Sequence, residues 1–185
     1  VLFRSTKTAR ATVIINGDIR MGRNIGLITG AASGIGLKTV KRLLTKGWEI
    51  YGLDNDKNGL EQSWKEIDNS NYITKPCDLR SEEALKKIFA EIQKNQQKIN
   101  ALIACAGVLK LGTLEDMSTE DFDAVFDINV RGLWLSAREA LPFLKNAASR
   151  GELSRIILLS SVSALRPKID SGAYSARSEE HTSEL

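Results

Sequence analysis

TGAASGIG, residues 29–36, is the stretch that decides the fold of this chain. It follows a short apolar run at 25–28 and opens a helical pattern that extends to about residue 46. A strand, a glycine turn and a helix in this order are typical of a dinucleotide-binding element, in which free N–H groups and the helix dipole hold a pyrophosphate. The spacing is Gly-x-x-x-Gly-x-Gly, with three residues in the first gap instead of one, so a tight turn without a ligand remains the alternative.

Strand-like and helix-like patterns alternate along the rest of the chain. This alternation predicts one doubly wound α/β domain over residues 21–176, a Rossmann-like parallel sheet between two layers of helices. The wholly apolar run Ile156–Leu159 predicts a strand that is buried on both faces. The expected strands are 25–29, 48–53, 71–75, 101–104 and 156–159, and the expected helices are 35–46, 57–68, one from Ser81, one from Ser118 to about Asn146, and one after Gly172.

The residues that could carry chemistry follow the carboxyl ends of these strands. In an open parallel sheet, that edge is where ligands bind. Agreement among five strand ends is more specific than the glycine turn alone. The residues at these positions are Gly30, Asp54, Asp78, Gly107 and Ser161.

Asp54 lies 24 residues after Gly30, near the offset at which an acidic residue binds the adenosine ribose of a dinucleotide. Its negative charge would repel the 2′-phosphate of NADP, and no Lys or Arg occupies 31–35 or position 55 to attract that phosphate. The sequence therefore favours NAD over NADP. The alternative is a loop aspartate that caps the next helix.

Asp78 and Asn129 each allow two interpretations. Asp78, with Leu79 beside it, is expected either to face the adenine or to cap the next helix. Asn129 shares a helical stripe with apolar residues, so its amide is expected to point inward, where it needs hydrogen-bond partners. Those partners belong either to a polar network at the site or to a neighbouring stretch of backbone.

Ser161 and Tyr174 form a possible acid–base pair. Ser161 follows the fifth strand, and Tyr174 lies thirteen residues later, near the start of the last helix. A tyrosine hydroxyl exchanges its proton sluggishly at neutral pH unless a nearby cation favours the phenolate. With such help, Ser161 could hold a substrate oxygen by a hydrogen bond while Tyr174 exchanges the proton.

The composition argues against several classes of function. The net charge is only +3 and no basic stripe is visible, so we expect no nucleic-acid partner. His181 is the one histidine, which leaves none near the predicted site for a metal or a catalytic triad. No apolar run is long enough for a membrane span, and no secretory signal is visible. Two cysteines without a pairing pattern, Cys77 and Cys105, fit a reducing, cytoplasmic location.

In order and spacing, these motifs resemble the short-chain dehydrogenase/reductase (SDR) family from Ile25 to Ala176. The resemblance implies an NAD-dependent enzyme that transfers a hydride to or from a secondary alcohol or ketone, in a protein that forms homodimers or homotetramers. The motifs that carry it are Thr29–Gly36, Asp54, Asp78-Leu79, Cys105-Ala106-Gly107, Asn129-Val130, Ser160-Ser161 and Tyr174-Ser175-Ala176.

The resemblance also implies a role for each residue. Tyr174 would be the acid–base group, Ser161 would orient the carbonyl, and Asn129 would hold a water molecule in the proton relay. The cofactor-binding set would be Thr29, Gly30, Ser33, Gly34, Ile35 and Gly36 around the pyrophosphate, Asp54 at the ribose, Asp78 and Leu79 at the adenine, and Cys105, Ala106 and Gly107 beside the cofactor.

The sequence departs from the family pattern at two positions. Cys105 stands where the family usually has an asparagine, and a thiol is a poor substitute for an amide that anchors the fourth strand. The lysine that the family places four residues after the tyrosine would fall at Ser178. That lysine binds the nicotinamide ribose and favours the phenolate, so we expect the chain as it stands to be inactive.

The two ends of the chain suggest a reason for the second departure. Codons AGA-TCG-GAA-GAG-CAC encode residues 177–181, and their reverse complement encodes residues 1–5. This nucleotide sequence resembles a common sequencing adapter, so we expect 1–5 and 177–185 to be translated adapter around a domain that is incomplete at its C-terminus. Two unrelated tails are the alternative. Residues 6–20 are either upstream sequence or a genuine extension before Met21.

Two other functions keep part of this pattern. A dinucleotide-binding sensor or scaffold would have the same fold without turnover. A methyltransferase also places an acidic residue after the second strand of a similar sheet. The glycine spacing and the pairing of Ser161 with Tyr174 argue against the methyltransferase.

Overall fold

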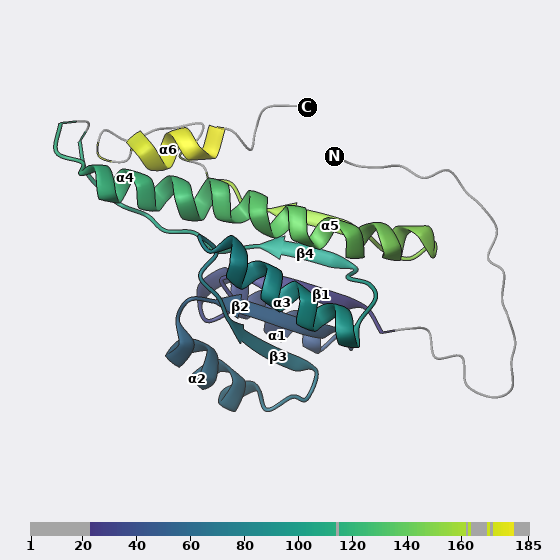
Figure 1. Cartoon of the computed structure of the whole chain (residues 1–185). Coiled ribbons are helices and arrows are strands. Elements are labelled where there is room, and N and C mark those ends of the chain that lie inside the picture. The colour runs from purple at the N-terminus through teal and green to yellow at the C-terminus, as the bar shows by residue number, and fades with distance from the viewer. Residues whose placement is uncertain (1–22, 114, 162, 164–169, 171, 180–185) are drawn as a thin grey trace, which may run out of the picture.

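The computed structural model describes residues 23–113, 115–161, 163, 170 and 172–179, so the expected adapter and upstream segments lie almost wholly outside the described residues. Five parallel strands form one sheet in the order β3-β2-β1-β4-β5 (Figure 1). Strands β2 and β3 are added on one side of β1, and β4 and β5 are added on its other side. This strand order is that of a doubly wound fold. The strands are β1 Ile25–Thr29, β2 Glu49–Asp54, β3 Tyr72–Pro76, β4 Ala101–Ala104 and β5 Arg155–Leu158.

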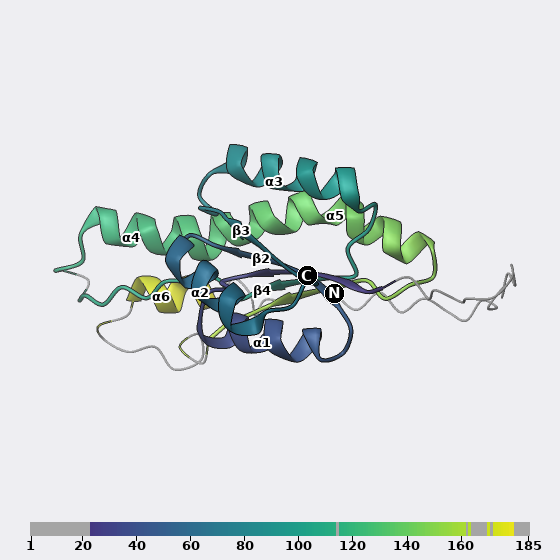
Figure 2. The same ribbon diagram turned by 90° about the horizontal axis from the view of Figure 1, so that it is seen from below.

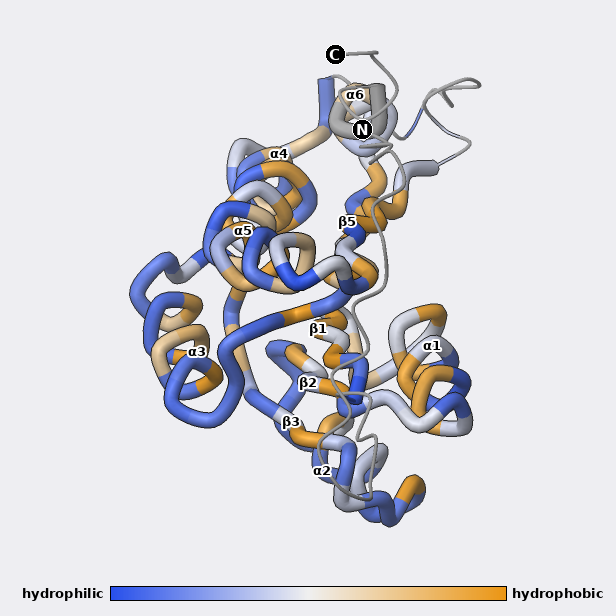
Figure 3. Tube along the Cα trace, turned by 90° about the vertical axis from the view of Figure 1, so that its right-hand side faces the viewer, coloured by the Kyte–Doolittle hydropathy of each residue, from blue (hydrophilic) through white to orange (hydrophobic). Residues whose placement is uncertain are grey.

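Helices cover both faces of the sheet, which confirms the predicted three-layer α/β/α architecture. Helices α3 and α5 lie on one face and α1 and α2 on the other (Figures 2 and 3). None of the helices in the described ranges combines the length and apolar character that a bilayer crossing requires. The helices are α1 Gly34–Leu44, α2 Lys57–Ile67, α3 Glu82–Asn95, α4 Thr119–Phe126, α5 Leu133–Ser149 and α6 Gly172–Glu179, with a π-helical turn η1 at Asp127–Gly132 between α4 and α5.

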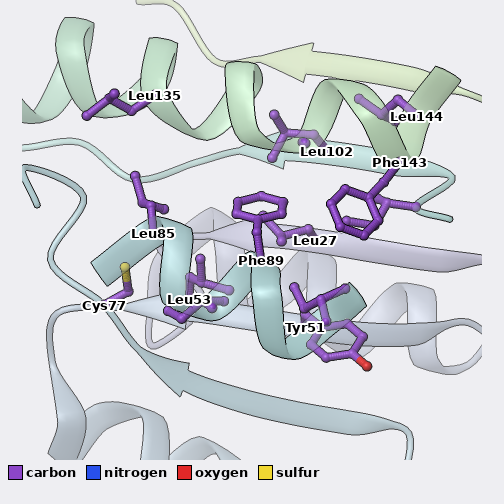
Figure 4. Close-up of a cluster of buried hydrophobic side chains, with 14 of the residues drawn as sticks. Leu27, Tyr51, Leu53, Cys77, Leu85, Phe89, Leu102, Leu135, Phe143 and Leu144 are labelled. Atoms are coloured by element: carbon purple, nitrogen blue, oxygen red, sulfur yellow. The ribbon is translucent and has the colours of Figure 1, made fainter. Parts of the chain in front are cut away.

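The strand side chains alternate between two cores, one under each helix layer. Leu27 of β1 packs in the core beneath α3 and α5, whereas its neighbour Ile28 packs in the core beneath α1 and α2. Figure 4 shows the first core, where Phe89 of α3 lies against Phe143 of α5 with ring centroids 5.7 Å apart. Burial on both faces explains why β1 and β4, the two strands that are buried throughout, are almost wholly apolar in sequence.

The fifth strand differs from its prediction. We expected Ile156–Leu159 to be buried on both faces, but Ile156, Ile157 and Leu158 are each more than 40% exposed. The prediction was wrong because, among the described residues, β5 is one of the two edge strands of the sheet and pairs with β4 alone. In the described part of the chain, the helices lie mainly over the inner strands and leave β5 largely uncovered.

The long helix expected from Ser118 begins there but is not uniform. The Ser118 hydroxyl caps it by accepting a hydrogen bond from Asp121 N at 3.1 Å. The α-helical pattern then changes to the π-helical turn η1 before α5 continues. A π-turn inserts an extra residue and is frequent at functional sites. Here it contains Asn129, the polar residue that the sequence predicted to point inward.

A buried polar cluster joins three strands at the amino-terminal edge of the sheet, opposite the predicted site. Asn100, which is fully buried, accepts a hydrogen bond from Ile25 N at 2.9 Å and donates to the Glu152 carboxylate and to Leu153 O, each at 3.0 Å. Lys98 also donates to Glu152. Burial alone would raise the pKa of Glu152, but these hydrogen bonds outweigh it and hold the pKa below its ordinary value. The cluster therefore stabilises the fold with Glu152 ionised.

We expect this cluster to make stability depend on pH. A carboxylate whose pKa is lowered on folding contributes fully above its unfolded value and loses that contribution as the pH falls through the folded value. The Glu152→Gln variant should therefore be less stable than the parent at pH 7, and the difference should shrink below about pH 4.5. Urea unfolding at pH 7, 5 and 3.5 measures it. A difference that does not change with pH would contradict the assignment.

Candidate active site

The glycine turn after β1 brings the backbone of three elements close together. Gly30 has a φ of +71°, and a Cβ atom there would lie 2.8 Å from Ala106 N in the loop after β4. A Cβ atom on Gly36 would lie 1.9 Å from Gly30 O, so the first turn of α1 packs directly on the turn backbone. These two contacts explain why the sequence has glycine at both positions.

The turn is open on the side where a ligand would approach. Gly34 has a φ of +54°, and nothing lies within 4 Å of the position of its missing Cβ. Ser33 is the N-cap of α1, yet its side chain makes no capping hydrogen bond. Ile35 is 63% exposed. The amino terminus of α1 therefore presents N–H groups and the positive end of its dipole to solvent, which suits an anion such as a pyrophosphate.

Thr29 links the turn to the loop after β4. Its hydroxyl accepts a hydrogen bond from Ala106 N at 3.2 Å, and its carbonyl oxygen accepts one from Cys105 N at 3.2 Å. Cys105 is half-buried, and burial raises the pKa of its thiol, so it is a small packing residue here and not an activated nucleophile. The first and fourth strand ends are thus held side by side.

Asn129 holds the same β4 loop from the helix side. Its amide oxygen accepts a hydrogen bond from Val108 N at 2.8 Å, and its amide nitrogen donates to Val108 O at 2.8 Å. A Cβ atom on Gly107 would lie 3.2 Å from the Asn129 oxygen. Asn129 is 1% exposed, as the stripe of apolar residues on its helix predicted. Both of its hydrogen bonds are with the backbone of Val108, so its partners are neighbouring backbone groups and not a polar side-chain network.

Asp54 connects the second strand end to the glycine turn. One carboxylate oxygen accepts a hydrogen bond from Ala32 N at 3.0 Å and the other accepts one from Asp56 N at 3.0 Å. Asp56, not Asp54, caps α2 through a hydrogen bond from Gly59 N at 2.9 Å. The capping interpretation of Asp54 is therefore wrong, and its half-buried carboxylate lies beside the turn as an acceptor.

Asp78 and Leu79 follow β3 at the same edge of the sheet, and their side chains lie in different surroundings. Cys77 N donates to Asp54 O at 2.7 Å, which places this loop against the end of β2. Leu79 is buried in the core beneath α3 and α5. Asp78 is partly exposed and is bound by Arg80, and the side-chain hydrogen bonds from Arg80 lower the pKa of its carboxyl group. The cap of α3 is Ser81, which accepts from Ala84 N at 3.2 Å.

Tyr174 belongs to α6, which packs against α4 (Figure 1), and Ser161 follows β5 in the chain. The Ser161 hydroxyl, half-buried just beyond β5, accepts a hydrogen bond from Ser163 N at 3.2 Å. Tyr174 is half-buried in the first turn of α6. Their assignment as an acid–base pair stays a prediction. The side chain of Ser178, where the family lysine was expected, lies outside the described residues.

Two residues that the sequence analysis missed also belong to this edge. The Arg80 guanidinium holds Asp78, and the Arg131 guanidinium of η1 donates to Arg80 O at 3.0 Å. Opposite charges two positions apart in a loop were a signal for the first pair. No local pattern pointed to the second, because its partners are 51 positions apart.

Comparison with known proteins agrees with this arrangement. A model of the short chain dehydrogenase family matches residues 24–177. The chain is 29% identical over 154 residues to 2,3-dihydro-2,3-dihydroxybenzoate dehydrogenase from Bacillus subtilis, covering 82% of this chain and 58% of that protein. It is 30% identical over 162 residues to human 3-hydroxyacyl-CoA dehydrogenase type-2, covering 82% of this chain and 61% of that protein. The chain thus spans about three-fifths of the length of these relatives.

A solved structure with a similar fold extends the comparison. The crystal structure of 3-ketoacyl-(acyl-carrier-protein) reductase from Brucella melitensis, complexed with NADH, superposes with a TM-score of 0.79 at 29% identity. The match covers 85% of this chain and 65% of that one. With the family match over residues 24–177 and the glycine turn at the carboxyl edge of the sheet, this chain belongs to the short-chain dehydrogenase family.

Proposed function

We propose that the protein is an oxidoreductase that transfers a hydride between NAD(H) and a secondary alcohol or ketone. The observation that carries the proposal is the linkage of the strand ends around one edge: Thr29 to Ala106, and Asp54 to Ala32. Beside this edge the turn has an open position at Gly34, where a Cβ atom would meet nothing within 4 Å. A dinucleotide fits an extended rim of this kind. The relative from Brucella melitensis, whose structure contains NADH, supports the cofactor assignment.

The residues at the carboxyl edge of the sheet have different roles in this proposal. In this proposal the backbone of 30–36 binds the pyrophosphate, and Asp54 accepts hydrogen bonds from the adenosine ribose. Asp78 lies at the adenine end. Asn129 holds the β4 loop in place through Val108, beneath the reacting end of the cofactor.

The acid–base step would fall to the residues near α6. Ser161 would hold the substrate oxygen by a hydrogen bond, and Tyr174 would give or take the hydroxyl proton. NAD supplies the hydride chemistry when bound, and the protein supplies binding, orientation and the proton path.

Asp54 gives the proposal a direct test on this chain. We expect the chain to bind NADH, and the Asp54→Ala variant to bind it about tenfold more weakly, because a charge-assisted hydrogen bond to the ribose is lost. The same variant should bind NADPH relatively better than the parent does, since the charge that repels the 2′-phosphate is gone. Titration of dihydronicotinamide fluorescence measures both affinities.

Two controls complete this experiment. The Asp56→Ala variant removes a neighbouring carboxylate that caps α2 and should leave the ratio of NADH to NADPH affinity unchanged. S-adenosylmethionine should not compete with NADH. Competition by S-adenosylmethionine, or an Asp54→Ala variant with the parent's ratio, would overturn the proposed cofactor site.

A further inference from the structure

The π-helical turn η1 contacts two separate loops at the carboxyl edge of the sheet. On one side, the Arg131 guanidinium donates a hydrogen bond to Arg80 O at 3.0 Å, in the loop after β3. On the other side, the Asn129 amide bonds to both backbone polar groups of Val108, in the loop after β4, each at 2.8 Å. One short segment, Asp127–Gly132, therefore bonds directly to the loops that follow the third and the fourth strands.

The contact between η1 and the loop after β3 is also a close steric fit. Gly132 is buried, and a Cβ atom there would lie 2.9 Å from the Leu79 Cβ and 3.3 Å from Leu79 O. These two atoms of Leu79 move only with its backbone, so an added methyl group would push the loop away from η1. Glycine at position 132 therefore allows the turn and the loop to lie as close together as they do.

Strands β3 and β4 are not neighbours in the sheet. Strands β2 and β1 lie between them, so no ladder of hydrogen bonds joins their ends directly. Three strand spacings of about 4.8 Å separate the two ends, which is about 14 Å in all. In the proposed site the dinucleotide extends over this distance, with its adenosine at the ends of β2 and β3 and its nicotinamide beside the loop after β4. Its affinity therefore depends on how precisely the two loops are spaced.

We propose that η1 fixes the distance between these two loops, and that Arg131 and Gly132 are positioning residues for the cofactor. This inference rests on the proposed dinucleotide function. A ligand with two linked halves binds more tightly than either half, because its second contact is intramolecular, and this gain is lost when the two subsites no longer match the span of the ligand. Neither residue needs to touch the cofactor, since both act through the backbone of the loop after β3.

The test compares NADH, which spans both loops, with AMP, which reaches only the adenosine end. NADH is titrated by its fluorescence, and AMP is titrated as a competitor that displaces NADH. We expect Arg131→Met to bind NADH about fivefold more weakly than the parent and AMP with an affinity within about twofold of the parent's. Gly132→Ala should weaken NADH binding by about tenfold or more, again with little change for AMP, because its methyl group displaces the loop after β3.

The contact with the loop after β4 provides a second measurement. Asn129→Ala removes the hydrogen bonds to Val108 and should weaken the binding of NADH without weakening that of AMP. Once η1 no longer holds this loop, its bond to the other loop cannot fix the distance between them. The double variant Asn129→Ala/Arg131→Met should therefore bind NADH no more weakly than Asn129→Ala alone.

Two further variants serve as controls. Arg131→Lys keeps a charged donor on a long side chain, so it should bind NADH more tightly than Arg131→Met does. Arg150→Met removes an arginine at the end of α5 that donates to the Gln97 side chain at 2.9 Å, at the amino-terminal edge of the sheet, and should leave both affinities unchanged. Melting curves by circular dichroism establish that each variant is folded. Arg131 is exposed, so Arg131→Met keeps the test decisive if Gly132→Ala does not fold.

Each remaining outcome has one meaning. Equal weakening of NADH and AMP binding by Arg131→Met would show that this residue only supports the fold of the loop after β3. Unchanged NADH binding by this variant, or additive effects in the double variant, would show that η1 does not couple the two loops. Each of these results overturns the role of η1 and leaves the cofactor assignment intact. A parent that does not bind NADH, or from which AMP does not displace NADH, would instead overturn the proposed cofactor site and this inference with it.

Discussion

Turnover by the Tyr174→Phe variant is expected to fall by about 10²–10⁴-fold, because a positioned acid–base group contributes a factor of this size. Phenylalanine keeps the ring that packs in the first turn of α6 and removes only the hydroxyl. Cofactor affinity should therefore stay close to that of the parent. The assay uses the longest reading frame recovered around this sequence, a panel of secondary alcohols and ketones, and NADH fluorescence for binding.

The chain offers a matched control for this substitution. Tyr72 lies on β3, away from the proposed proton path, and its hydroxyl is 3.2 Å from the Ser63 hydroxyl in the core. Tyr72→Phe should cost some stability and leave turnover unchanged. Equal loss of turnover and cofactor binding in Tyr174→Phe would refute the role of this hydroxyl as the proton donor.

The Gly36→Val variant is expected to lose both cofactor binding and much of its stability. Its Cβ atom would start 1.9 Å from Gly30 O and 2.6 Å from the Gly30 carbonyl carbon, and both are backbone atoms that cannot rotate away. Either α1 or the turn must move. Overpacking typically costs about 1–3 kcal/mol, and we expect the upper end of that range or more here. Urea unfolding and NADH titration of the same samples measure the two effects.

Alanine substitutions at two other glycines distinguish the effect of backbone strain on stability from a loss of cofactor binding. Gly47 and Gly34 both have positive φ values and open space around the missing Cβ, so alanine at either should cost about 1–2 kcal/mol. Gly34→Ala should also weaken NADH binding, since its methyl group would enter the proposed pyrophosphate site, whereas Gly47→Ala should not. If Gly36→Val binds NADH as the parent does, the turn is not part of the cofactor site.

Much of the fold could be predicted from local patterns. The first four strands, β1 to β4, were placed to within about one residue, because apolar runs between glycine turns and capping residues are local signals. The parallel sheet followed from the alternation of strands and helices. The position of the candidate residues at one edge followed in turn, because parallel strands all end on the same side.

The features that the sequence did not predict depend on distant partners. Asn100 bonds to Ile25 N across 75 positions, and Arg131 bonds to Arg80 O across 51. The exposure of β5 depends on its place in the sheet, which its apolar composition does not encode. The π-turn at Asp127–Gly132 was not predicted, because the sequence of this segment was interpreted as part of one continuous helix from Ser118.

The exposed outer rim of β5 has a consequence for the behaviour of the chain in concentrated solution. No strand in the described part of the chain pairs with that rim, and its side chains are apolar and more than 40% exposed from Ile156 to Leu158. An unpaired apolar strand is a template on which another extended segment can add. We therefore expect any self-association of this molecule to begin at β5, at the end of the sheet farthest from β3.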